Sequence, residues 1–279
     1  MKNWIAYSIS GVSILTLLAA GFACKKDSDQ AESQGTRFDL LQKTVTTYSY
    51  SSRKTTVNYS YNTSRQLVKI DIADNDPLIA SVSQTETFVR NASGQLDTSR
   101  FESYTNSALT YRTNTVYTYD AGGKLVLSVQ QTPMATMPYT DSCLYIYSGN
   151  ILQQRKDYRR FDGTGPYDLL RTANFQFDGQ GNLSRTIFTW TTHPIPDTAT
   201  FQYDNKVNAL PVDRLVFYWA PLFYNDYKPV NNPLQAVNAK GDFPSYNYEY
   251  RYTGNSKPLY RKMKIINSSE FTETLYYYD

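Results

Sequence analysis

Histidine and cysteine are scarce in this sequence. Its 279 residues include one histidine, His193, and two cysteines, Cys24 and Cys143. A zinc site draws most of its three or four ligands from these residue types, so the sequence predicts no metal site. His193 lies in a proline-rich loop, apart from the alternating segment that holds Cys143. We therefore expect no cysteine–histidine nucleophile and interpret Cys143 as a small buried side chain.

Other signatures of chemistry are missing as well. The net charge is only +3, and no basic run is interleaved with the aromatic residues, which argues against a nucleic-acid partner. A calcium loop concentrates several oxygen ligands, whereas the turn at Asp178 carries one carboxylate. Asp157 and Asp162, near Arg159 and Arg160, are interpreted as a solvated hairpin face. We predict no catalytic residues and no cofactor, and expect that the protein is not an enzyme.

The N-terminal residues 1–23 have the features of a signal peptide. Lys2 precedes an apolar run from Ile5 to Ala23, which ends directly before Cys24. The segment resembles a bacterial lipoprotein signal, in which the cysteine becomes the lipid-modified first residue, although Gly21 stands where such signals usually carry leucine. The alternative is an uncleaved transmembrane anchor, because the run approaches the ~20 residues that span a bilayer. The polar residues after Cys24 favour lipidation.

Residues 24–37 are predicted to be an acylated cysteine and a flexible tether, because they are polar and lack periodicity. The tether begins Lys25-Lys26-Asp27-Ser28-Asp29. A charged run in this place resembles the surface-export signal of Bacteroidota-type lipoproteins and is equally consistent with a solvated linker. We predict that lipid on Cys24 holds the protein at the outer membrane, on the cell surface or on the periplasmic face.

The remaining chain, residues 38–279, repeats one short unit. In Tyr117 to Leu127 two alternating segments flank a turn that contains Asp120, Gly122 and Gly123. The aspartate is suited to bind the backbone ahead of it, and one glycine is expected at a positive φ angle. Two strands joined in this way form a hairpin, and we expect Leu125 to lie opposite Tyr119.

Similar units recur along the chain at intervals of 26 to 30 residues, apart from one interval of 49. We call the last aromatic position before each turn the aromatic position, and the first aliphatic position after it the leucine position. The aromatic positions are Tyr61, Arg90 (which departs from the pattern), Tyr119, Tyr147, Phe177, Tyr203, Tyr252 and Tyr278. A period near 28 indicates a repeat architecture.

The repeats predict an all-β fold of about sixteen short strands. Alternation would place Tyr117, Tyr119, Leu125, Leu127 and Val129 on one face and mainly polar residues on the other. Long connections between parallel strands are absent, so we expect a long antiparallel β-meander. A sheet with one apolar face has to curl or be covered, and the expected form is a curled sheet or half-open barrel in a single domain.

One aromatic insertion, at about residues 210–245, interrupts the repeat after Tyr203. Its aromatic residues are too apolar for an ordinary exposed loop. Two interpretations stay open: the insertion plugs the end of the sheet, or it binds a ligand. The candidate ligand-binding residues are Phe217, Tyr218, Trp219, Phe223 and Tyr224.

The Tyr-x-Tyr-Asp-x-x-Gly-x-Leu copies resemble YD-repeat (Rhs-like) hairpins. Together with the lipidation signal, the tether and the segment from Tyr203 to Pro233, they are similar to YD-repeat-like lipoproteins of Bacteroidota over nearly the whole mature chain. The resemblance implies a winding sheet of hairpins and, for some members, carbohydrate binding. The match departs at Arg90, at the short turn after Tyr147 and at the insertion.

Three classes of function fit these features. The favoured one is a lipid-anchored binding or structural module, non-catalytic, with a glycan as the expected ligand, because Tyr and Trp rings suit sugar rings. The alternative is a periplasm-facing half-barrel that carries apolar ligands. A transmembrane barrel would also have many alternating strands, but polar residues such as Thr118 and Ser128 at outward positions argue against it.

Overall fold

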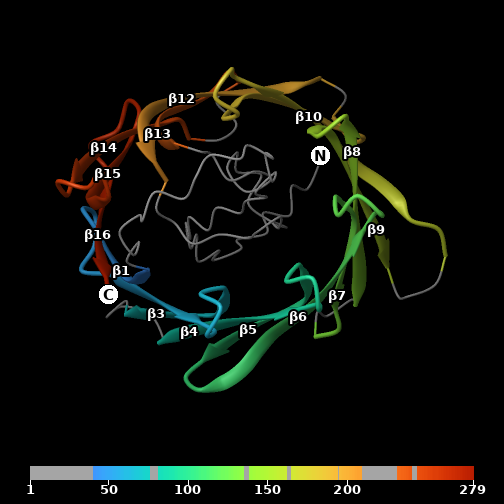
Figure 1. Ribbon diagram of the computed structural model, residues 1–279, viewed down its shortest axis with the longest axis horizontal. Helices are drawn as coiled ribbons and strands as arrows, with labels where there is room; N and C mark the ends of the chain where they lie inside the picture. Colours follow the sequence, from blue (N-terminus) through green and yellow to red (C-terminus); the bar gives the residue numbers. More distant parts are fainter. Residues whose placement is uncertain are drawn as a thin grey trace, which may run out of the picture.

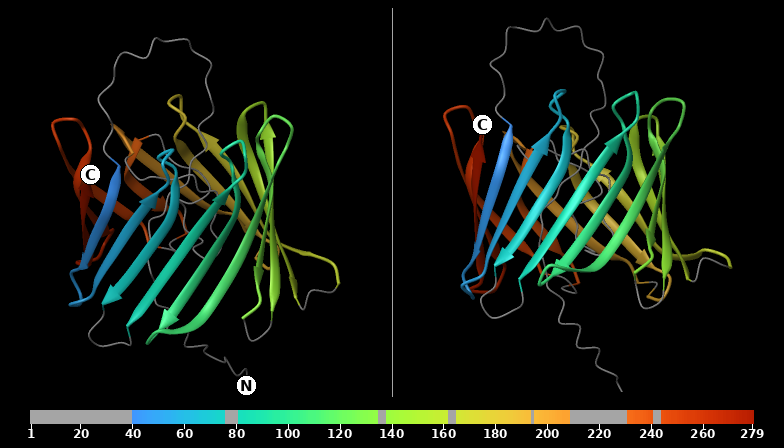
Figure 2. Two further views of the ribbon diagram at one scale, coloured as in Figure 1. Left: turned by 60° about the horizontal axis from the view of Figure 1, so that its bottom comes forward. Right: turned by 90° about the horizontal axis from the view of Figure 1, so that it is seen from below.

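A closed barrel of antiparallel strands makes up the protein. The computed structural model describes residues 40–75, 81–134, 138–161, 165–193, 195–208, 231–240 and 244–279. Within these ranges sixteen strands each pair with their neighbours in sequence, and the last strand also pairs with the first (Figure 1, Figure 2). No helix in them is long and apolar enough to cross a membrane. The predicted all-β meander is confirmed, and it closes completely.

The strands pair as eight hairpins, numbered here from one (β2–β3) to seven (β14–β15), with β16 and β1 as the eighth. Their turns lie at one end of the barrel, called the turn end, which is uppermost in Figure 2. The strands are β1 Leu41–Tyr48, β2 Lys54–Tyr61, β3 Leu67–Asn75, β4 Val82–Arg90, β5 Leu96–Thr105, β6 Ala108–Tyr119, β7 Leu125–Thr132, β8 Tyr139–Ser148, β9 Ile151–Phe161, β10 Asp168–Phe177, β11 Leu183–Trp190, β12 Asp197–Val207, β13 Asn231–Asn238, β14 Tyr246–Tyr252, β15 Pro258–Ile265 and β16 Phe271–Tyr278.

The turn of hairpin three has the predicted form. The backbone N–H of Asp120 donates to the carbonyl of Lys124 (2.9 Å), and Oδ1 of Asp120 accepts the N–H of Lys124 (2.8 Å). Gly123, rather than Gly122, has the left-handed conformation, with φ of 79°. Glycine carries no Cβ that would clash there, so the residue type and the turn agree.

A β-bulge follows each turn and decides which side chains share a face. In hairpin three Tyr119 lies opposite Leu125, as predicted, but Thr118 lies opposite Leu127 and Tyr117 opposite Ser128. The prediction that Leu127 and Val129 share the face of Tyr117 is therefore wrong, because one extra residue shifts the alternation by one position. Equivalent register shifts occur in hairpins one, two, four, five and seven.

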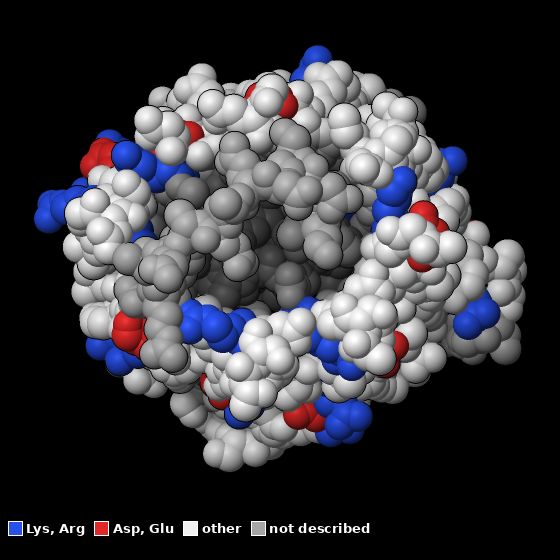
Figure 3. All heavy atoms as spheres, viewed as in Figure 1, with Lys and Arg blue, Asp and Glu red and all other residues white. Residues whose placement is uncertain are grey.

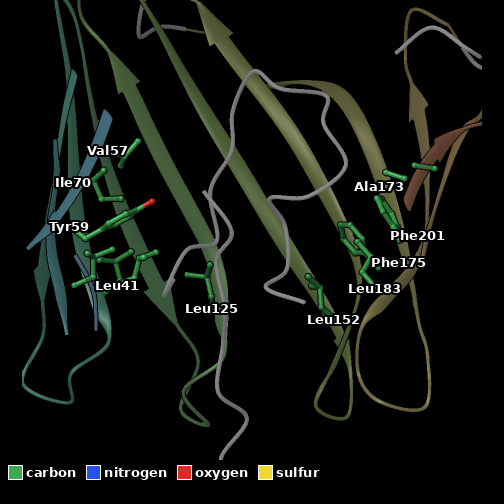
Figure 4. Close-up of a cluster of buried hydrophobic side chains, with 14 of the residues drawn as sticks. Leu41, Val57, Tyr59, Ile70, Leu125, Leu152, Ala173, Phe175, Leu183 and Phe201 are labelled. Carbon is green, nitrogen blue, oxygen red and sulfur yellow. The ribbon is translucent and has the colours of Figure 1, made fainter. Parts of the chain in front are cut away.

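The apolar face of the sheet is the inner wall of the barrel. Buried side chains such as Val57, Tyr59, Ile70 and Phe175 lie on this wall (Figure 4). The residues that alternate with them point outward. Cys143 lies on the inner face, opposite Ser128 and Asp157, and packs against the core as predicted.

Hydrogen bonds at several of the aromatic positions join a hairpin to the one before it. A tyrosine hydroxyl donates to the carbonyl at the leucine position of the preceding hairpin. Arg90, which lacks the ring, keeps the connection through Nη2. The bonds are Tyr61 to Leu41 (2.7 Å), Arg90 to Leu67 (3.4 Å), Tyr119 to Leu96 (2.9 Å), Tyr203 to Leu183 (2.8 Å) and Tyr278 to Pro258 (2.8 Å).

The barrel closes by completing one more hairpin from the two ends of the described chain. Tyr278 lies opposite Leu41, just as Tyr119 lies opposite Leu125. Asp279 donates its N–H to the carbonyl of Leu40 (3.1 Å) and accepts the N–H of Leu40 on Oδ1. These two bonds reproduce those between Asp120 and Lys124. The first and last strands thus pair in the geometry of the internal repeats.

We predict that Tyr119→Phe lowers the free energy of unfolding by about 1 kcal/mol, because it removes a partly buried hydrogen bond to the carbonyl of Leu96 while keeping the ring. Urea unfolding measures the change. Tyr277→Phe is the matched control, since the Tyr277 side chain is exposed on the outside of the barrel. Equal losses in the two variants would show that the hydroxyl of Tyr119 contributes nothing particular.

Candidate functional site

The predicted ligand-binding residues Phe217, Tyr218, Trp219, Phe223 and Tyr224 lie outside the described residues, as does Cys24. The structure does describe both points where the insertion meets the barrel. Asn208 follows β12, and Asn231 begins β13. The insertion therefore takes the place of the turn in hairpin six and leaves the barrel at the turn end.

Buried asparagine side chains and the half-buried Asp204 fix the base of the insertion. Asn182 and Asn231 form two hydrogen bonds of 2.9 Å with each other, one through each amide oxygen. Oδ1 of Asp204 accepts the N–H of Asn232 (3.1 Å), and its Oδ2 accepts the hydroxyl of Tyr252. These residues come from hairpins five, six and seven. The two strand ends that carry the insertion are thus tied to both neighbouring hairpins.

A second polar cluster lies on the inner wall, on β9 and β10. Asp157 accepts hydrogen bonds from Nε of Arg155 (2.6 Å) and Nε of Arg171 (2.7 Å), and all three residues are buried. Burial opposes ionisation of Asp157, but the two guanidinium groups, Arg155 foremost, outweigh it and lower its pKa to about 2. Asp157 therefore stays charged and holds two cations inside the barrel.

The neighbouring groups are poorly suited to nucleophilic chemistry. Burial raises the pKa of the Cys143 thiol to about 12, so the thiol is protonated at neutral pH. Burial also raises the pKa of Asp141 to about 7, although the hydrogen bond from Arg159 (2.8 Å) opposes this shift. His193 is exposed in the loop between β11 and β12, so these residues do not assemble a cysteine–histidine pair.

The prediction of a solvated face around Asp157 and Arg159 is wrong. Both side chains point into the barrel. The guanidinium carbon of Arg159 lies 4.2 Å from the ring centre of Tyr139 and 5.7 Å from that of Phe161. Asp162 lies outside the described residues. The sequence did contain a signal for this arrangement. Arg155, Asp157 and Arg159 are two residues apart, and such residues share one face of a strand, so they would face inward together.

A third polar feature is a single arginine among tyrosines on the opposite part of the wall. Arg261 of β15 is buried, and its titratable neighbours are four tyrosines, Tyr276, Tyr250, Tyr248 and Tyr59. Burial raises the pKa of Tyr59 to about 12, so this phenol is uncharged at neutral pH. Nη2 of Arg261 donates to Oγ1 of Thr274 (3.0 Å), and its Nε has no hydrogen-bond partner.

We predict that Asp157→Asn lowers the free energy of unfolding at neutral pH by about 3–5 kcal/mol, because it leaves two buried cations without a counter-ion. Asp71→Asn, which alters an exposed pair with Lys69 (2.8 Å), is the control and should cost about 0–1 kcal/mol.

The pH dependence of the parent protein provides a second measurement. The folded pKa of Asp157 is depressed, so its contribution is present above its ordinary pKa near 4 and is lost as the pH falls toward 2. Urea unfolding of the parent and of Asp157→Asn should therefore converge on acidification. A constant difference between pH 7 and pH 3 would contradict the assignment.

Comparisons with known proteins reveal a likeness in fold. No protein-family model and no curated protein matches the sequence. The chain is similar to the crystal structure of a porin-like protein from Bacteroides uniformis, with 13% identity, a TM-score of 0.53, and coverage of 86% of this chain and 98% of that one. A porin-like protein from Bacteroides vulgatus is 11% identical over 86% of this chain and 99% of that one, with a TM-score of 0.43. The first likeness shows a shared fold, and the resemblance to YD-repeat lipoproteins stays a prediction.

Proposed function

We propose that this protein is a non-catalytic binding module, held at the outer membrane by lipid on Cys24, and that its ligand is a glycan. The observation that carries the proposal is the polarity of the outer wall. The residues that alternate with the buried ones include many charged side chains, among them Lys69, Asp71, Arg100, Glu249 and Lys264. Such a wall is suited to water.

A barrel that spans a membrane has the opposite arrangement, with an apolar band outside and polar residues inside. Here exposed apolar side chains do occur on the outer wall, but charged residues interrupt them; Leu144, for example, lies opposite Lys156. Burying these charges in lipid would be costly. Attachment to a membrane therefore requires a separate anchor, and the predicted lipid on Cys24 would provide one. The porin-like neighbours from Bacteroides are consistent with an envelope protein of this kind.

The insertion is the proposed glycan site, through Phe217, Tyr218, Trp219, Phe223 and Tyr224. It is the long interruption of an otherwise regular series of turns. Its base is fixed by the hydrogen bonds of Asn182, Asp204 and Asn231, which would hold a binding loop at a constant place on the turn end. Aromatic side chains with polar tips are favoured at binding surfaces.

The apolar inner wall favours a second candidate, a carrier of apolar ligands. Val57, Ile70 and Phe175 would suit such a ligand. However, the same wall carries Arg261, whose buried Nε has no hydrogen-bond partner among the described residues, and an apolar ligand would offer it none. The wall thus supports a polar ligand better than an apolar one.

The anchor is tested by Cys24→Ser. We expect this variant to leave the membrane fraction, because a barrel with a charged exterior has no other means of insertion. Fractionation of cells that express the parent or the variant, together with metabolic labelling by a fatty acid, measures the effect. Retention of an unlabelled variant in the outer membrane would refute the proposed anchor.

The glycan site is tested by Trp219→Ala and Tyr224→Ala. We expect both variants to keep the melting temperature of the parent and to lose its glycan binding on an array. Tyr277→Ala, on the outer wall, is the control and should bind like the parent. If instead each insertion variant loses several kcal/mol of stability, as core aromatics do, and the parent binds no glycan, the insertion is a structural plug.

A further inference from the structure

Two arginines occupy the same position of the repeat but differ in their partners. Arg155 of hairpin four lies opposite Tyr145, and Arg261 of hairpin seven lies opposite Tyr250. In both hairpins this pair is the next inward-facing pair below the aromatic position. Two residues further along the strand, hairpin four has Asp157, which neutralises Arg155, whereas hairpin seven has Met263. The chain thus contains a neutralised arginine and an equivalent one without a carboxylate.

Arg261 has no counter-ion within the part of the chain that the structure describes. Arg261 is only 5% exposed. Its Nε lacks a hydrogen-bond partner, and none of the described ion pairs includes it. The titratable side chains around it are tyrosines, Tyr276 foremost, and burial raises the pKa of Tyr276, so it carries no charge at neutral pH. A buried cation without a counter-ion destabilises the folded protein. The equivalent position in other hairpins holds a small or apolar residue, such as Ser128 in hairpin three and Ile70 in hairpin one.

We infer that Arg261 and its tyrosines form a binding site for the carboxylate of an acidic sugar. This inference rests on the proposed function and specifies its ligand class. A guanidinium group binds a carboxylate through two parallel hydrogen bonds, and the unpartnered Nε is one of the donors that this requires. The hydroxyls and rings of Tyr59, Tyr250 and Tyr276 would contact the hydroxyls and the face of the sugar.

The site is placed within reach of the turn end. Arg261 lies one inward-facing pair below Tyr252 and Pro258, which stand at the rim. Figure 3 shows this end of the barrel, where Lys and Arg side chains lie at several points around the opening. A positive rim would attract an anion toward the site.

The experiment measures binding by isothermal titration calorimetry with three probes: sodium glucuronate, glucose and sodium sulfate. The parent is expected to bind glucuronate at least tenfold more tightly than glucose or sulfate. Two variants remove the site in different ways. Arg261→Gln removes the cation, and Met263→Asp supplies the neutralising carboxylate that hairpin four already has; each should weaken glucuronate binding at least tenfold. Lys262→Gln, on the outer face of the same strand, is the control.

Thermal unfolding without ligand separates a binding role from a structural one. Because Arg261 is an unpaired buried charge, Arg261→Gln and Met263→Asp are both expected to keep or raise the melting temperature. A fall of the melting temperature in both variants, with no glucuronate bound by the parent, would assign Arg261 a structural role and overturn the inference.

Three further outcomes would also overturn it. Sulfate binding as tight as glucuronate binding would indicate a general anion site. Glucuronate binding that both variants retain would place the acidic sugar elsewhere. Binding of neutral sugars alone, lost in Trp219→Ala but retained in Arg261→Gln, would leave the proposed glycan function intact and remove only the acidic ligand.

Discussion

The structure depends on a simple constraint: a phenolic hydroxyl inside the barrel wall requires a hydrogen-bond partner. At the aromatic positions of Tyr61, Tyr119, Tyr203 and Tyr278 that partner is a backbone carbonyl of the preceding hairpin. At the next inward-facing pair, the hydroxyls of Tyr117 and Tyr145 form hydrogen bonds with the hydroxyls of Ser99 and Ser128 (3.0 and 3.2 Å). These bonds link hairpins that are neighbours in sequence and therefore favour pairing in sequence order. Because the last hairpin is assembled from β16 and β1, the same bonds also close the ring.

The β-bulge makes this recognition possible. If the strands paired without the bulge, Leu127 would lie opposite Tyr117 and face inward, and no serine would stand opposite this tyrosine. The bulge places Ser128 on the inner wall, where its hydroxyl forms a hydrogen bond with that of Tyr145 in the next hairpin. Phe201 shows the consequence of losing the hydroxyl: the corresponding residue of hairpin five, Thr186, is buried and its Oγ1 has no partner. The repeat thus encodes pairs of residues in neighbouring hairpins as well as the hairpins themselves.

Much of the fold could be predicted from local signals. The interval between turns gives the number of hairpins, and Asp120 with Gly123 gives the turn geometry, because both depend on residues close in sequence. The faces beyond each turn could not be predicted by alternation alone, since a bulge shifts them without any distinctive residue. The inward orientation of Arg155, Asp157 and Arg159 was missed for a related reason. Charged residues usually mark a solvated face, and only the closed barrel puts this face inside. The proposed aromatic site of the insertion was inferred from composition, and only its base lies within the described residues.

Departures from the repeat carry the information about function. The inward position just below the rim holds Ile70, Ser99, Ser128 and Thr186 in hairpins one, two, three and five, and such residues serve packing or a hydroxyl pair. An arginine there serves neither purpose. In hairpin four it is accompanied by Asp157, which pairs with it and with Arg171 and so gives the buried arginine a counter-ion. In hairpin seven only the arginine position differs, and the buried charge has no counter-ion among the described residues. Hairpin four shows that an arginine at this position can be paired with an aspartate two residues further along the strand, as Arg155 is with Asp157. Such a pair would therefore also be sterically feasible in hairpin seven. The uncompensated arginine is therefore better explained by a ligand that brings its own negative charge than by the requirements of the fold.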